Sequence, residues 1–207
     1  MLIPPEWMPD ADIDRIVVHW TVGRGKPNGN ERAHYHFLID DEGRVVRGEY
    51  GVQANSRNAP IGRKGWPYAA HVFRLNSGSI GVSMCGMLNA TLTDFGPHPL
   101  NQNQWDACVA LCAQLAERYR VPVTERGILG HCEVERVYGV DQLGKWDPWA
   151  AFPGVRQVAD LSTRNWGQWA RSVPIIGGRF RQEVAATISR RSASQSASAS
   201  ASSQPGA

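Results

Sequence analysis

The sequence predicts an α/β domain in which a mixed central β-sheet is flanked by helices. Three observations support this fold class: a β-branched run at residues 13–21, short strand-like segments within 35–48 and 79–85, and one long amphipathic segment at 101–120. Strands separated by a helix and by long loops are typical of a sheet covered by helices. With 207 residues, the chain has room for a single domain and some additional sequence.

The strands are predicted from apolar runs. Residues 13–21 (IDRIVVHWT) are β-branched and apolar, which indicates a buried strand. Residues 22–33 are rich in Gly, Pro and Asn and are predicted to form a loop. Residues 35–39 (YHFLI) and 44–48 (RVVRG), separated by a polar turn that ends in Gly, predict a β-hairpin. Residues 79–85 (SIGVSMC) return to strand character.

Residues 101–120 form the clearest predicted helix. Its large apolar side chains recur at spacings of three and four, which places them on one stripe: Trp105, Cys108, Cys112, Leu115 and Tyr119. Asn101 is a suitable N-cap, and Pro122 ends the helix. We expect both cysteines of this stripe to pack as small apolar side chains in a reduced, cytoplasmic protein, because the N-terminus lacks the pattern of a secretory signal.

The character of the sequence changes beyond residue 160. We therefore divide the chain into a domain at 1–160, a basic and helix-compatible extension at 161–191, and a tail at 192–207. In the tail, 12 of 16 residues are Ser or Ala, and this composition predicts disorder.

The net charge of +3 is unevenly distributed. Residues 171–207 contain five Arg and one Glu, a net charge of +4, whereas residues 1–170 contain 17 basic and 18 acidic side chains, a net charge of −1. A neutral body argues against nucleic acid as a partner. The longest uncharged run, residues 75–93, is too polar for a membrane span. We expect a monomer.

Three side chains are candidates for a metal site. His19 follows the predicted first strand, and His131 lies in a Gly-flanked segment. Pro148 favours an extended backbone at Asp147, so Lys145 and Asp147 are predicted to face one site. Two imidazoles and one carboxylate suit a catalytic Zn²⁺ with an open fourth position. On spacing alone, ordinary structural roles for both histidines remain the alternative.

Five short motifs occur in a characteristic order: VVHWT, YHFLID-x-x-G, SIGV, GH-x-E and K-x-D-P. Together they resemble the type 2 N-acetylmuramoyl-L-alanine amidases, a family that includes phage endolysins and the peptidoglycan recognition proteins. The resemblance spans residues 13–155. It implies the α/β fold above, with a zinc site at the strand ends and peptidoglycan or muropeptides as the substrate.

The resemblance also implies roles for single residues. His19, His131 and Asp147 match the family's zinc ligands. Lys145 matches the lysine that stabilises the transition state, and Tyr35 matches the tyrosine placed near the reactive water in phage-type members.

Trp20, His71 and Asn76 correspond to positions that line the substrate groove. Ser83 occupies a position where some members have a glutamate base, which favours the tyrosine-bearing, phage-like branch. The insert at 135–144 makes the spacing from the second histidine to the lysine longer than in compact phage enzymes.

Several alternatives remain open at this stage. His34 and His36 have the spacing of two strand ligands, and strand alternation would let either this pair or Tyr35 face the metal. Cys132 beside His131 suggests a cysteine nucleophile, although neighbours on an extended chain point apart. A binding module without hydrolysis is a third possibility.

The predicted function is zinc-dependent hydrolysis of the amide bond between N-acetylmuramic acid and L-alanine. Without a secretory signal, we expect an endolysin that is cytoplasmic and reaches the cell wall by holin-like release. The alternative is a cytoplasmic enzyme that recycles soluble muropeptides. The basic segment at 171–191 suggests contact with anionic wall polymers or lipid, or else a solvated basic helix.

Overall fold

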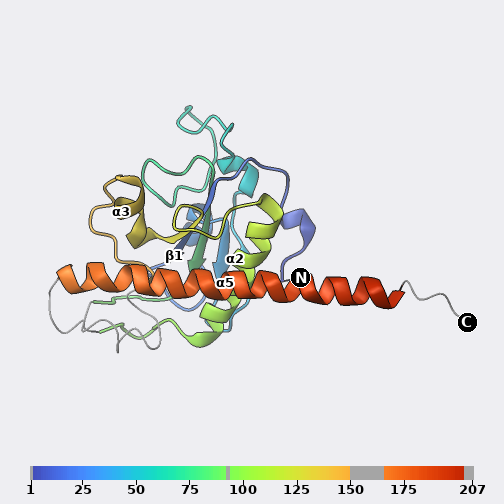
Figure 1. The fold of residues 1–207 in the computed structure, drawn as a ribbon. Coiled ribbons are helices and arrows are strands. Elements are labelled where there is room, and N and C mark those ends of the chain that lie inside the picture. Colours follow the sequence, from blue (N-terminus) through green and yellow to red (C-terminus); the bar gives the residue numbers. More distant parts are fainter. Residues whose placement is uncertain (1, 92–93, 150–165, 203–207) are drawn as a thin grey trace, which may run out of the picture.

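The computed structural model describes residues 2–91, 94–149 and 166–202. Its centre is a five-stranded sheet of order β3-β2-β4-β1-β5 (Figure 1). The strands are β1 (Arg15–Trp20), β2 (Phe37–Ile39), β3 (Val45–Arg47), β4 (Ser79–Met84) and β5 (Ile128–Gly130). The predicted α/β class with a mixed sheet is confirmed.

Pairing in the sheet determines where side chains meet. Strands β1, β2, β4 and β5 run parallel, and only β3 is antiparallel, in the predicted hairpin with β2. The carboxyl ends of the four parallel strands therefore share one edge of the sheet. His19 lies at this end of β1, opposite Ser83 of β4, while β5 ends at Gly130 directly before His131.

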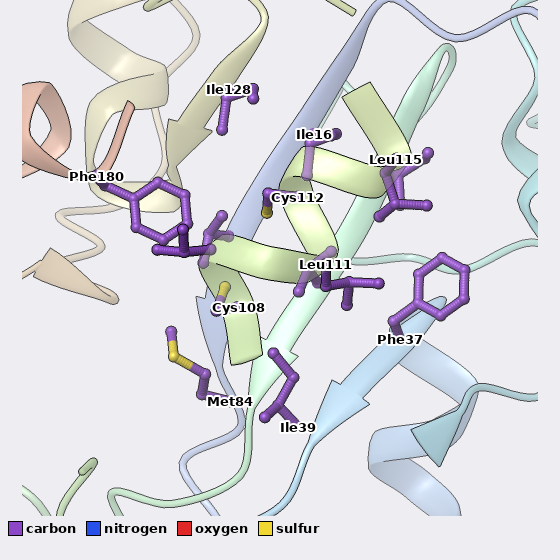
Figure 2. Packing of buried hydrophobic residues seen from close by; sticks show 14 of the residues in the cluster. Ile16, Phe37, Ile39, Met84, Cys108, Leu111, Cys112, Leu115, Ile128 and Phe180 are labelled. Carbon is purple, nitrogen blue, oxygen red and sulfur yellow. The ribbon is translucent and has the colours of Figure 1, made fainter. Parts of the chain in front are cut away.

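One face of the sheet is covered by α2 (Gln102–Tyr119), which is the predicted amphipathic helix. Asn101 caps its start by accepting a hydrogen bond from the backbone N–H of Gln104 at 3.1 Å. Figure 2 shows Cys108, Leu111 and Cys112 of α2 facing sheet residues in the core. Both cysteines are completely buried and free, as their spacing predicts.

The long helix α5 (Trp166–Ser202) packs beside α2 and runs past the body of the molecule (Figure 1). Ile176, Phe180 and Val184 belong to the main core cluster. The segment predicted as a basic extension at 161–191 therefore completes the core where it is described. The domain boundary predicted at residue 160 lies outside the described residues.

Helix α5 also continues through Ser192 to Ser202, where the sequence predicts disorder. Residues 192–202 contain six Ser and four Ala, and alanine has the highest helix propensity; the packed part of α5 supplies the nucleus from which the helix continues. The hydroxyls of Ser192, Ser194 and Ser196 each donate to the carbonyl four residues earlier. Residues 203–207 of the predicted tail lie outside the described residues.

A further difference occurs before β2. Helix α1 (Gly29–His34) stands where the sequence predicts a loop, because Asn28 and Glu31 form a reciprocal capping box that the Gly- and Asn-rich composition conceals. Tyr35 is the C-cap of this helix, so β2 begins only at Phe37.

Short elements complete the fold: the 3₁₀ helices η1 (Pro5–Trp7), η2 (Val52–Asn55) and η3 (His131–Glu133), and helix α3 (Val134–Tyr138). Within the described ranges, every helix is too short or too polar to cross a membrane.

Candidate metal centre

His19, His131 and Asp147 meet at the carboxyl edge of the sheet. His19 comes from β1, His131 from η3 after β5, and Asp147 from the loop that follows α3. The Nδ1 atoms of the two histidines are 3.1 Å apart, and Asp147 Oδ2 lies 3.2 Å from His19 Nδ1 and 3.3 Å from His131 Nδ1. All three side chains are buried.

This triangle has the dimensions of a metal site. For Zn–N and Zn–O bonds of about 2.0–2.1 Å, tetrahedral geometry places neighbouring ligand atoms about 3.3 Å apart. The three observed separations are 3.1–3.3 Å, and the donor set of two imidazoles and a carboxylate suits Zn²⁺. Among the described residues, these three form the only group of at least three potential ligands close enough to hold one ion.

Outer hydrogen bonds orient both imidazoles. His131 Nε2 lies 2.9 Å from Gln142 Oε1, which only accepts, so Nε2 carries the proton and Nδ1 presents its lone pair to the triangle. Gln142 Nε2 donates to the carbonyls of Phe73 and Val140, which fixes the orientation of this amide. On the other imidazole, His19 Nε2 lies 3.1 Å from His71 Nδ1.

Burial and mutual attraction shift the pKa values of all three side chains in the metal-free protein. Burial, with smaller contributions from the charges of His131 and Lys145, lowers the pKa of His19 to about 4, so this imidazole is neutral at pH 7. Burial alone would raise the pKa of Asp147, but the two histidines outweigh it and hold that pKa below its usual range. Attraction to Asp147 likewise outweighs burial at His131 and raises its pKa.

The triangle lies at a cavity of about 1060 Å³, large enough for a substrate bigger than one sugar unit. Lys145 and Tyr35 both line this cavity. Lys145 is solvent-exposed. The Tyr35 ring centroid lies 5.2 Å from that of His19, and its hydroxyl donates to the Trp20 carbonyl at 3.4 Å. Burial raises the pKa of Tyr35 above its ordinary value.

The three residues predicted to line the groove all border the same cavity. Trp20 is buried and packs edge-on against Trp146, with ring centroids 4.6 Å apart. His71 contacts His19 through the pair of ring nitrogens, Nδ1 and Nε2, that lie 3.1 Å apart. Asn76 Oδ1 accepts from the backbone N–H groups of His71 and Val72, so it also shapes the loop before β4.

The alternative ligand pair His34 and His36 is not brought together with other ligands. His34 is exposed at the end of α1 and bonds to the Asn30 carbonyl, whereas His36 is buried and accepts from the Gly81 N–H. The strand alternation assumed for residues 34–36 was wrong, because α1 extends to His34. The pair is therefore not part of the candidate metal centre.

The cysteine nucleophile also lacks support. Burial raises the pKa of the Cys132 thiol well above its ordinary value, which disfavours the reactive thiolate.

Sequence reasoning missed Gln142. This residue lies within the insert at 135–144, which was recognised only as extra length. A glutamine in a loop does not by itself predict any particular role, and only the fold places Gln142 next to His131.

Fold and site together define an α/β protein with a buried histidine–histidine–aspartate centre in an open cavity. The family model for N-acetylmuramoyl-L-alanine amidase matches residues 9–150, and the chain belongs to this family. The matched range includes all three residues of the candidate centre. Family membership supports a peptidoglycan amidase activity.

Solved structures of similar fold include amidases and recognition proteins. The endolysin amidase LysCS from Clostridium intestinale is 18% identical, with a TM-score of 0.42 over 74% of this chain and 86% of that chain. The endolysin of Thermus scotoductus bacteriophage Ph2119 is 16% identical (TM-score 0.40; 81% and 94% covered). Drosophila peptidoglycan recognition protein SD is 20% identical (TM-score 0.41; 60% and 72%). No curated protein matches the sequence.

Proposed function

We propose that this protein is a zinc-dependent N-acetylmuramoyl-L-alanine amidase, which cuts the amide bond between the lactyl group of muramic acid and L-alanine. The observation that supports this function most is the triangle of His19, His131 and Asp147, with ligand separations of 3.1–3.3 Å, within a chain of the amidase family. These three side chains would hold Zn²⁺, which polarises a carbonyl and lowers the pKa of water.

Lys145 and Tyr35 supply the remaining chemistry. The Lys145 ammonium on the cavity wall would stabilise the negative charge that develops on the carbonyl oxygen. Because the pKa of Tyr35 is raised, its hydroxyl stays protonated at neutral pH and acts as a hydrogen-bond donor rather than as a base. Trp20, His71 and Asn76 border the space for the glycan and peptide.

Digestion of purified peptidoglycan tests the reaction. New L-alanine N-termini without new reducing sugar ends are expected, and reducing ends in their place would refute the assignment. Release of neither product by a zinc-loaded protein that still binds peptidoglycan would favour a binding module.

Three substitutions separate metal binding from rate. Asp147→Ala should abolish both zinc binding and activity, because it removes a ligand. Lys145→Ala should keep zinc but lose about 10²–10³ in kcat, the range found when one oxyanion-stabilising donor is removed. Tyr35→Phe should also keep zinc and lower the rate. Full zinc retention by Asp147→Ala would place the third ligand elsewhere.

We further propose an endolysin role with holin-like release. Ser83, not a carboxylate, stands opposite His19 in β4, which agrees with the tyrosine-bearing, phage-like branch. Rates on intact sacculi and on soluble muropeptides distinguish this role from recycling. An endolysin should favour sacculi, and a clear preference for soluble muropeptides would support the recycling enzyme.

A further inference from the structure

Glu133 lies two residues after His131 and is completely buried. Its Oε2 atom accepts from the backbone N–H of Gly130 at 2.8 Å and from the indole N–H of Trp149 at 2.7 Å. Gly130 directly precedes one candidate ligand, and Trp149 follows Asp147 by two residues. One carboxylate therefore joins the two segments that present the second and third ligands.

Two arginines face this carboxylate: Arg136 of α3 lies 3.6 Å from Glu133 Oε1, and Arg181 of helix α5 lies closer, at 3.1 Å. Arg181 is buried, and its Nη1 donates to both oxygens of Glu133 at 3.1 Å and to the Ile128 carbonyl of β5 at 3.1 Å. Burial raises the pKa of Glu133, while Arg181 is the largest influence that opposes the rise. A buried carboxylate without such a partner is strongly destabilising.

Two glycines permit this close approach. A Cβ added at Gly177 of α5 would lie 2.4 Å from Glu133 Oε1, and one added at Gly130 would lie 2.5 Å from Trp149 Nε1. A Cβ at either point would force the carboxylate or the indole to move from its present position. A backbone hydrogen bond, from the Cys132 N–H to the Asp147 carbonyl at 2.8 Å, also holds these two ligand-bearing segments together.

We propose that Arg181 is a positioning residue for the metal centre, which acts through Glu133 and Trp149 to set the separation of His131 and Asp147. Arg181 lies outside residues 9–150, the range matched by the family model. In this chain, helix α5, which lies outside the matched range, thus contributes to the geometry of the metal site. The inference rests on the metal site of the proposed function.

Arg191 offers a matched control. It lies on the same helix, pairs with Glu117 at 3.2 Å and donates to the Ala110 carbonyl, so it fastens α5 to α2 without contacting Glu133. Arg191→Ala tests attachment of the helix, whereas Arg181→Met and Arg181→Lys test the contact to Glu133. Lysine keeps the positive charge but has one terminal nitrogen in place of the planar guanidinium, whose Nη1 contacts Glu133 and the β5 carbonyl while Nη2 lies 3.6 Å from Glu125.

The experiment is a Co²⁺ titration of the metal-free full-length proteins, followed by visible absorption, with unfolding midpoints measured in parallel. Arg181→Met should weaken Co²⁺ binding about tenfold, the lower end of the range for outer-shell changes, and alter the visible spectrum. Arg181→Lys should fall between Arg181→Met and wild type. Arg191→Ala should bind Co²⁺ as wild type does.

Each outcome decides a separate question. Unchanged Co²⁺ affinity and spectrum in Arg181→Met would overturn the proposal, as would an equal loss in Arg191→Ala. If Arg181→Met does not fold, Arg181→Lys decides alone, and wild-type binding by that variant overturns the proposal. Absence of Co²⁺ binding in the wild type would instead refute the metal site of the proposed function.

Discussion

Acidification should destabilise the metal-free protein through His36. This imidazole is 1% exposed and accepts a hydrogen bond from the Gly81 N–H at 2.9 Å. Burial lowers its pKa from 6.5 to about 4, although a contact with Asn55 acts in the opposite direction. Between these two pH values, the unfolded chain binds a proton that the folded protein does not. The free energy of unfolding therefore falls as the pH decreases from 6.5 to 4.

The size of the effect follows from the two pKa values. A shift from 6.5 to about 4 corresponds to about 3 kcal/mol once the pH is below both values. Between pH 7 and pH 5, the same two pKa values lower the free energy of unfolding by about 2 kcal/mol. With a urea m-value of about 2 kcal/mol/M, the unfolding midpoint should decrease by about 1 M from this residue alone.

The assay compares urea unfolding at pH 7 and pH 5, in chelator, for wild type and His36→Asn. The asparagine Oδ1 can still accept from Gly81, so the substitution removes the titration while keeping the hydrogen bond. Between pH 7 and pH 5, the free energy of unfolding of the variant should fall by about 2 kcal/mol less than that of wild type. Val72→Ala, which removes buried volume but no titratable group, should retain the wild-type pH dependence. Equal pH dependence in wild type and His36→Asn would refute the reasoning.

Three further substitutions test the core contact of α5, the surroundings of His71 and the N-cap of α2. Phe180→Ala should cost about 3–5 kcal/mol in the free energy of unfolding, measured by urea, because the ring is fully buried; a loss below about 1 kcal/mol would mean that α5 is not part of the core. Gly81→Ala should weaken zinc binding, measured by calorimetry, because its Cβ would lie 2.6 Å from His71 Cγ and displace the ring whose Nδ1 lies 3.1 Å from His19 Nε2; unchanged affinity would contradict this. Asn101→Ala should cost about 1 kcal/mol through loss of the α2 cap, and a thermal melt equal to wild type would contradict it.

The sheet and α2 could be predicted because their signals are local. A β-branched run, a turn with Gly, and apolar residues at helical spacing each specify one element without reference to the rest of the chain. Helix α1 was missed because Gly29 and Asn30 lower the helix propensity of a segment whose capping box, Asn28 with Glu31, stabilises it.

The candidate metal centre could be predicted only by combining local patterns with order along the chain. His19 was placed by the strand that precedes it, since the end of a buried strand opens onto a cleft. His131 and Asp147 depended on the family resemblance, because neither a Gly-flanked histidine nor an aspartate before proline specifies a ligand by itself. One partner of the ligands is far away in the sequence: His19 bonds to His71, 52 positions away. No local pattern reports such a contact.

The basic C-terminal segment shows that the net charge of a sequence segment does not reveal where its charged side chains lie in the structure. Arg181 counts toward the +4 of residues 171–207, yet it is buried against Glu133, while Arg179 and Arg191 pair with Glu183 and Glu117. Glu183 is already counted in the net charge of +4, so the two partners from the rest of the chain, Glu133 and Glu117, offset two of these four positive charges. Wall or lipid attachment by residues 171–191 therefore stays a prediction. The burial of Arg181 beside the segments of two candidate ligands makes support of the metal centre the better-founded role for this helix.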